Sequence, residues 1–174
     1  MPLKYDHLLG LEFNIEHQNC YTLVRMFYRD NYGIELTDYA CPTNWWSTHL
    51  DLYSGLMDPE GFDLLHCHPR EYQPGDIIMS AIQSSSGNHL SVVLDTGDIL
   101  HHLVGQRSCV TPYGGLFRNT TVGVYRHRDV ARLPREKHLL DIQEVLPPHV
   151  RRRLDEIARN REAAARDAGG TPDA

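Results

Sequence analysis

The hydrophobic pattern of this chain changes its period partway along, and this change constrains the fold more than any other feature of the sequence. Residues 20–33 place apolar side chains at helical spacing, and a second helix is predicted from Thr43 or Asn44 to about Met57. Short apolar runs between turn sequences then predict strands at 77–82, 89–94, 99–104 and 121–127. Helices followed by hairpin-linked strands predict an α+β domain, in which N-terminal helices pack on an antiparallel sheet.

The first predicted helix has clear signals at both ends. Asn19 is a favourable N-cap residue, and Gly33 is a favourable residue for ending a helix. Cys20 therefore falls in the first turn, where unpaired backbone N–H groups and the helix dipole favour a thiolate. This position makes Cys20 a candidate nucleophile.

Composition narrows the classes of function. The chain has 174 residues, and residues 1–125 hold 6 basic against 14 acidic side chains, a balance of -8 that disfavours nucleic-acid binding. No apolar run is long enough to span a membrane, and residues 1–7 lack the apolar stretch of a secretory signal peptide. The four cysteines form no CxxC pair, so we expect reduced thiols.

The C-terminal part differs from the rest. Residues 126–174 hold 11 basic and 9 acidic side chains, a balance of +2. A charged helix is predicted from Val150 to about Arg166, and its only large apolar residues, Val150, Leu154 and Ile157, form a narrow stripe. We therefore expect a domain over residues 1–130 and, over 131–174, an extension for docking to a partner, with its last residues disordered. A solvated helix without a partner is an equally good reading of its composition.

A thiolate nucleophile needs a base within hydrogen-bond reach, and two histidines lie on predicted paired strands. His89 opens one strand, and His101 lies twelve residues later, across the turn at 95–98. Side by side, one can act as the base and the other can orient it, as the third member of a triad does. Strand alternation sends His102 to the opposite face, so we assign this role to His101. Taken singly, Cys20 and His89 are more often ordinary core or surface residues.

The same residues carry a resemblance to a known family, in three motifs. These are Cys20-x-x-Leu23-Val24-Arg25-x-x-Tyr28, Pro74-Gly75-Asp76-Ile77, and His89-x-x-Val92-x-Leu94-x-x-Gly97-x-Ile99-x-His101. Over about residues 8–127 the chain resembles the NlpC/P60 papain-like cysteine peptidases, whose motif order is Cys, His and a polar third residue. The stretches 99–102 and 121–127 look most like the phage tail-tip branch of that family.

The resemblance implies a function and a setting. It implies a cysteine peptidase that cleaves peptide stems of bacterial peptidoglycan, with Cys20 as nucleophile, His89 as general base, His101 as orienting residue, and no cofactor. It also implies a place at the tip of a phage-like or gene-transfer-agent tail, among other tail-tip proteins, after assembly in the bacterial cytoplasm. The alternative is a tail-assembly component whose active site is vestigial or only processes a neighbouring tail protein.

Three features of the sequence depart from the family pattern. Asn19 stands where the family usually has an Asp that helps to hold a substrate amine, and Tyr21-Thr22 replaces the usual Ser-Gly or Trp-Gly. Phe13 is the nearest match to a Tyr near the oxyanion site, and it cannot donate a hydrogen bond. These differences bear on substrate and rate, because the loss of one oxyanion donor can cost about 10²–10³ in kcat.

A zinc-dependent hydrolase is a more distant alternative. His66-Cys67-His68 would put two imidazoles on one face of a strand, where zinc could use them with a third ligand. His66-x-His68-Pro69 also resembles the start of the JAMM metallopeptidase signature. That signature requires Ser and Asp downstream, where this sequence has Asp76 and Met79, so we predict no metal site.

Overall fold

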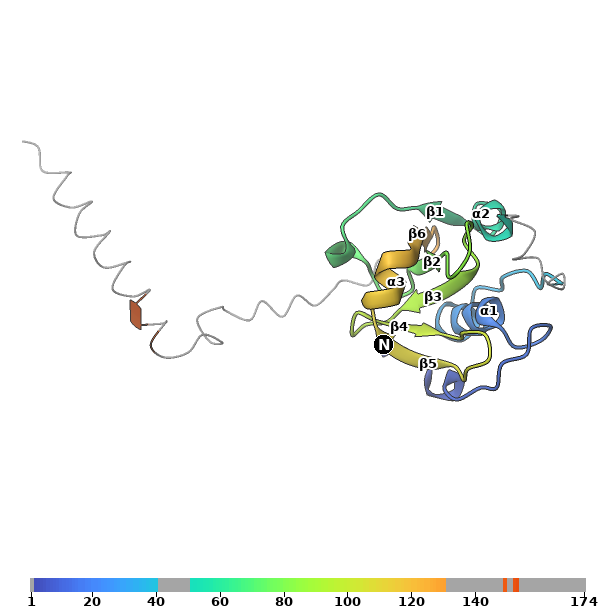
Figure 1. Cartoon of the computed structure of the whole chain (residues 1–174), viewed down its shortest axis with the longest axis horizontal. Helices are drawn as coiled ribbons and strands as arrows, with labels where there is room; N and C mark the ends of the chain where they lie inside the picture. The colour runs from blue at the N-terminus through green and yellow to red at the C-terminus, as the bar shows by residue number, and fades with distance from the viewer. Residues whose placement is uncertain (1, 41–50, 131–148, 150–151, 154–174) are drawn as a thin grey trace, which may run out of the picture. The chain divides into compact units, whose positions relative to one another are not determined.

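The structure is a computed structural model that describes residues 2–40, 51–130, 149 and 152–153 (Figure 1). Its centre is a six-stranded antiparallel sheet in the order β1-β6-β2-β3-β4-β5. The strands are β1 (Phe62–Leu64), β2 (Ile77–Ser80), β3 (His89–Val93), β4 (Asp98–His101), β5 (Cys109–Pro112) and β6 (Thr121–His127). The helices are α1 (Cys20–Tyr32), α2 (Leu52–Met57) and α3 (Gly115–Thr120), with short 3-10 helices η1 (Asp6–Leu8) and η3 (Pro69–Glu71). The predicted α+β architecture is confirmed.

The sheet separates two hydrophobic clusters, because alternate residues of each strand point to opposite faces. On one face, Ile77, Leu90 and Leu100 pack in the same cluster as α1. On the other face, Ile78, Val93 and Ile99 pack with Phe117 of α3 and Val124 of β6. Helices α1 and α3 therefore cover opposite faces of the sheet, and the central strands β2 and β3 are buried throughout (Figure 1).

Helix α1 begins and ends where the sequence predicts. Asn19 is the N-cap, and its side chain accepts hydrogen bonds from the backbone N–H groups of Tyr21 and Thr22. Gly33 follows the helix in the left-handed conformation, with φ of 66°, and its N–H reaches back to the carbonyls of Tyr28 and Arg29. The predicted apolar stripe is buried at Cys20, Leu23, Val24 and Phe27 and partly buried at Met26, and Tyr21 and Tyr28 are buried as well.

The prediction of one continuous helix from residue 43 or 44 to Met57 is wrong at Asp51. Residues 43–50 lie outside the described residues, and α2 begins only at Leu52. Asp51 is non-helical and caps α2 with its carboxylate, which accepts from the N–H of Ser54 at 3.2 Å. Asp51 therefore starts a short helix instead of continuing a longer one, since a capping carboxylate competes with the helical backbone.

Other differences concern short elements near turns. Strand β4 ends at His101 rather than at the predicted Val104, because a turn follows in which the N–H of Gln106 donates to the carbonyl of Leu103. The sequence does not predict strands β1 and β5 or helix α3, because these short elements carry no strong periodic signal. The predicted helix at 150–166 and the docking extension fall almost wholly outside the described residues, so both stay predictions.

A buried ion pair fixes the start of β2. Asp76 is 1% exposed, and its carboxylate accepts two hydrogen bonds from Arg126 of β6, at 2.7 and 2.8 Å. The same carboxylate accepts from the N–H of Gln73 at 2.8 Å, which closes the turn before the strand. Gly75 occupies this turn with φ of 89°, and a Cβ there would clash with the Tyr32 side chain.

Candidate active site

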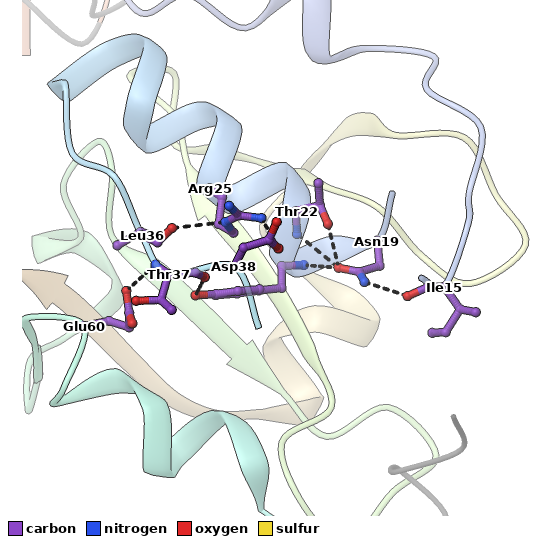
Figure 2. A network of polar contacts seen from close by, with 9 residues as sticks. Ile15, Asn19, Thr22, Arg25, Leu36, Thr37, Asp38 and Glu60 are labelled. Atoms are coloured by element: carbon purple, nitrogen blue, oxygen red, sulfur yellow. Dashed lines mark hydrogen bonds and ion pairs between the residues drawn. The ribbon is translucent and has the colours of Figure 1, made fainter. Parts of the chain in front are cut away.

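Cys20 lies at the first position of α1 and is 6% exposed. The adjacent Asn19 side chain is held from two sides: its oxygen accepts from Tyr21 and Thr22, and its nitrogen donates to the carbonyl of Ile15 at 2.8 Å. Figure 2 shows Asn19 bridging the helix and the Ile15 segment in this way. The capped helix start therefore fixes the position of the Cys20 thiol.

The start of α1 is also tied to the segment that follows the helix. Arg25 donates to the carbonyl of Leu36 at 3.2 Å and pairs with Asp38, while the N–H of Thr37 donates to Glu60 at 2.9 Å (Figure 2). The hydroxyl of Tyr21 donates to the carbonyl of Thr37 at 2.9 Å. This network attaches the end of α1 that carries Cys20 to residues far along the chain.

Cys20 and His89 line the same cleft, which has a volume of about 550 Å³. Asn19 and Tyr53 line it beside Cys20, and the Tyr53 hydroxyl lies 3.5 Å from the Cys20 sulfur. The remaining walls are formed by apolar residues and amides, namely Phe13, Ile15, Ile82, Gln83, Asn88, Leu103, Val104, Gln106 and Leu116, together with His102. The cleft is therefore large enough to hold several peptide groups against the thiol.

His89 and His101 lie next to each other on the α3 face of the sheet. His101 of β4 is directly paired with Ser91 of β3, so His89, two residues earlier, is its diagonal neighbour. Their ring centroids are 5.7 Å apart, with an interplanar angle of 80°. Phe117 of α3 packs against both rings, at centroid distances of 5.8 and 4.5 Å. The structure thus brings the two predicted histidines together, with His89 at the cleft and His101 behind it.

Burial keeps both histidines neutral near pH 7. Desolvation, and to a lesser extent the neighbouring histidines, lowers the pKa of His89 to about 3. Desolvation, with a smaller effect of His102, lowers the pKa of His101 to about 4. A neutral imidazole has one bare nitrogen, so each ring can both donate and accept a hydrogen bond at neutral pH.

The polar atoms of this pair are unequally satisfied. His89 Nε2, His101 Nδ1 and the hydroxyl oxygen of Ser80 are buried and have no hydrogen-bond partner among the described residues. By contrast, Nε2 of His101 lies 3.2 Å from the Thr111 hydroxyl and 3.5 Å from the Cys109 sulfur, both on β5. Buried polar atoms without partners are rare in proteins, and they call for an explanation in terms of function or an unseen partner.

His102 occupies a different environment from His101. It lines the cleft, and its ring packs edge to face on Phe13 at 5.3 Å. Burial lowers the pKa of His102, and the backbone of Gln106 and Leu11 opposes that shift. His102 thus reaches the cleft itself, whereas His101 contacts the ring of His89 from behind.

The histidines at 66 and 68 are not on a strand face, which corrects the sequence prediction. Strand β1 ends at Leu64, and both side chains are exposed in the loop before η3. The Nδ1 atom of His68 caps η3 by accepting from the N–H of Arg70 at 3.2 Å. Among the described residues, no three His, Cys, Asp or Glu side chains are grouped as a metal site would need.

Sequence reasoning missed three residues of the site. Tyr53 supplies a hydroxyl next to Cys20 that Phe13 cannot supply, and Phe117 and Thr111 contact the histidine rings. None lies in a motif, and Phe117 and Thr111 belong to elements without a periodic signal.

No helix in the described part of the chain is long and apolar enough to cross a membrane.

Comparison with known proteins relates the chain to one family. The model of the NlpC/P60 family matches residues 11–126. Two curated relatives are both called tail tip assembly protein K: one from Escherichia phage N15 is 33% identical over 125 residues, 71% of this chain, and one from Escherichia phage lambda is 32% identical over 125 residues, 70% of this chain. These matches cover only 50% and 60% of the relatives' own lengths.

Proposed function

The chain belongs to the NlpC/P60 family, and from that membership we propose that it is a cysteine peptidase with Cys20 as nucleophile, His89 as general base and His101 as the residue that orients His89. The observation that carries this proposal is that Cys20, at the start of a helix, and His89, at the start of a strand, line one cleft. Family membership alone implies a cysteine hydrolase in general terms.

The environment of His89 favours general-base catalysis over a preformed ion pair. Because burial lowers the pKa of His89 from its ordinary value to about 3, its imidazole is neutral at pH 7. Neutral His89 takes the thiol proton of Cys20 as the sulfur attacks the substrate carbonyl. The resulting imidazolium then gives that proton to the leaving amine as the C–N bond breaks, and water hydrolyses the thioester to release the acid and the thiol.

The cleft also offers donors for the oxyanion that forms during attack. The Tyr53 hydroxyl lies 3.5 Å from the Cys20 sulfur, and Tyr53 lines the same cleft as Cys20. It is the group that can replace the donor that Phe13 lacks. Asn19, held by Ile15 and the helix N–H groups, keeps the sulfur at a fixed place without adding a negative charge beside it.

For the substrate and setting, we propose peptide stems of bacterial peptidoglycan, cut at the tip of a phage-like tail to aid entry through the cell wall. The support is the family together with two relatives described as tail tip assembly proteins of phages. Other tail proteins are the proposed partners, and the extension at 131–174 is the proposed segment for docking to them.

A second candidate function follows from the relatives' description as assembly proteins. In this version the domain is a structural part of the tail tip, and its site is vestigial or processes a neighbouring tail protein. The two candidates predict different products, because only a cell-wall peptidase releases fragments from purified peptidoglycan.

The test is incubation of the full chain with purified peptidoglycan, with released fragments identified by mass. We expect the wild type to release stem-peptide fragments and Cys20→Ala to release none while keeping the wild-type melting temperature. Cys67→Ala is the matched control, since Cys67 lies outside the residues that line the cleft, and it should keep activity. No release by the wild type, with cleavage of a co-expressed tail protein instead, would support the second candidate.

A further inference from the structure

We propose that Thr111 is a positioning residue of the site, whose hydroxyl fixes the tautomers of His101 and His89 so that His89 turns a bare nitrogen to Cys20. This inference rests on the proposed function, because it explains how the proposed base is held in its active form. Thr111 lies on β5, outside the three motifs that carry the family resemblance.

Four strands bring the relevant side chains into one row. Ser80 of β2 is directly opposite His89 of β3, His89 is the diagonal neighbour of His101 of β4, and His101 is directly opposite Cys109 of β5. Thr111 lies two residues beyond Cys109 on the same face, where its hydroxyl oxygen is 3.2 Å from Nε2 of His101. The row therefore runs from the cleft to the edge strand of the sheet.

Two buried ring nitrogens in this row without a partner among the described residues can pair as donor and acceptor. His89 Nε2 and His101 Nδ1 are buried, have no partner among the described residues, and belong to rings in edge-to-face contact at 5.7 Å. In the proposed row, a hydrogen bond joins these two nitrogens and satisfies both. One nitrogen must then carry the proton and the other must accept it.

The direction of that bond decides whether His89 can act as a base. If the Thr111 oxygen accepts a proton from His101 Nε2, then His101 Nδ1 is bare and accepts from His89 Nε2. This leaves His89 Nδ1 bare and available for the thiol proton of Cys20. If Thr111 instead donates to His101, every bond reverses, and His89 carries its proton on Nδ1 and cannot act as a base through that atom.

Two neighbours compete with this assignment. The Cys109 sulfur lies 3.5 Å from the same Nε2 of His101, but sulfur is a weak acceptor and the hydroxyl oxygen is closer. The Ser80 hydroxyl, buried and also without a partner among the described residues, lies across from His89 and could bond Nε2 in place of His101. If Cys109 or Ser80 were the partner instead, substitution of that residue, and not of Thr111, would change the histidine tautomers.

The test reads histidine tautomers directly in the full chain, by long-range proton–nitrogen NMR correlation of ¹⁵N-histidine-labelled protein at pH 7. The expected wild-type result is a proton on Nε2 of both His89 and His101. Thr111→Val should move the proton of His101 to Nδ1 and lower kcat about tenfold at unchanged KM, the rate equivalent of one neutral hydrogen bond. Thr111→Ser should restore both the tautomer and the rate.

Control variants separate the competing partners. Cys109→Ala and Ser80→Ala should each leave the tautomers of His101 and His89 as in the wild type, and Thr111→Ala provides a second removal of the hydroxyl if Thr111→Val does not fold. An unchanged His101 tautomer in the Thr111 variants, or a shift in Cys109→Ala or Ser80→Ala instead, would overturn the proposal. Because the tautomers are read without substrate, an inactive wild type would refute the proposed function while leaving the role of Thr111 to be decided by the spectra.

Discussion

The two ends of the β2–β3 pair both bury polar side chains, yet they satisfy them very differently. At the first end, Asp76 is almost fully buried and accepts three hydrogen bonds, two from Arg126 and one from Gln73. At the other end, Ser80 faces His89, and each has a buried polar atom without a partner among the described residues. The two ends are separated only by the length of a four-residue strand.

This difference distinguishes a structural polar cluster from a functional one. A fully bonded carboxylate that ties a turn to β6 stabilises one arrangement of the chain and leaves no atom free to react. Neutral histidines with unsatisfied nitrogens lower stability, and a protein keeps such groups where they have chemistry to perform. We therefore expect substitutions at the two ends to separate stability from activity.

The largest effect is expected at the reactive end, in His89→Gln. This change removes the proposed base, so hydrolysis should fall by about 10²–10⁴-fold, the usual contribution of a positioned base. Stability should fall little, because the Gln amide keeps hydrogen-bonding groups at the buried place of the imidazole. Initial rates and urea unfolding measure the two quantities, and His17→Gln, on an exposed residue, is the control. Hydrolysis at the wild-type rate would remove His89 from the mechanism.

The structural end should respond in the opposite way. Asp76→Asn removes the partner of a largely buried arginine, and breaking a buried pair in this manner costs about 3–5 kcal/mol of unfolding free energy. The folded fraction should keep the wild-type activity. Asp38→Asn breaks an ion pair whose carboxylate is 80% exposed and should cost less than about 1 kcal/mol. Equal losses of stability in the two variants would show that burial of the Asp76 pair is unimportant.

Acid should weaken the fold through the histidines. The pKa values of His89 and His101 are lowered by burial to about 3 and about 4, below the ordinary value of 6.5. Between these values the unfolded chain binds more protons, so the free energy of unfolding falls as pH drops from about 6.5 toward 4. Each buried histidine contributes a slope of about 1.4 kcal/mol per pH unit. Urea unfolding at several pH values measures this slope, and His89→Gln should reduce it. An identical slope in the variant would show that His89 is charged or exposed in the folded chain.

The smallest effect is expected at the helix start. Asn19→Ala removes two hydrogen bonds from the N–H groups of α1 and one to Ile15, so it should cost about 1 kcal/mol of unfolding free energy. Thermal melts measure this loss, with Glu35→Ala, on an exposed residue after the helix, as the control. Hydrolysis should fall as well, because the Cys20 thiol loses its fixed position. An unchanged melting temperature and unchanged activity would mean that the Asn19 side chain neither stabilises α1 nor positions the Cys20 thiol.

Sequence reasoning recovers the parts of the fold that are governed by strong local signals. Helix α1 has a cap, a stop and a periodic apolar face, and the buried strands are apolar runs bounded by turns, so their positions follow from local chemistry. The break at Asp51 comes from a local capping hydrogen bond that competes with the helix. The short elements β1, β5 and α3 depend on tertiary contacts, which the sequence does not display.

The residues of the site show the same difference between strong local signals and tertiary contacts. Cys20, His89 and His101 have a fixed order and spacing that a motif can reveal. Thr111 reaches the site from an edge strand that sequence patterns did not predict, and Tyr53 from the end of a predicted helix that carries no functional motif. Only the structure identifies these two residues as part of the site. The loop position of His66 and His68 depends on where β1 ends, and a strand of three residues leaves no clear pattern.

The central proposal, that Cys20 is a nucleophile activated by His89, is tested most directly by alkylation rates at each cysteine. Full-length protein is treated with iodoacetamide near pH 7, and the modified cysteines are followed by peptide mass spectrometry. We predict that Cys20 reacts faster than Cys41, Cys67 and Cys109, and that His89→Gln slows Cys20 alone, because His89 takes the thiol proton as the sulfur attacks the reagent. Faster reaction at Cys41, Cys67 or Cys109, or a Cys20 rate that is independent of His89, would contradict the proposal.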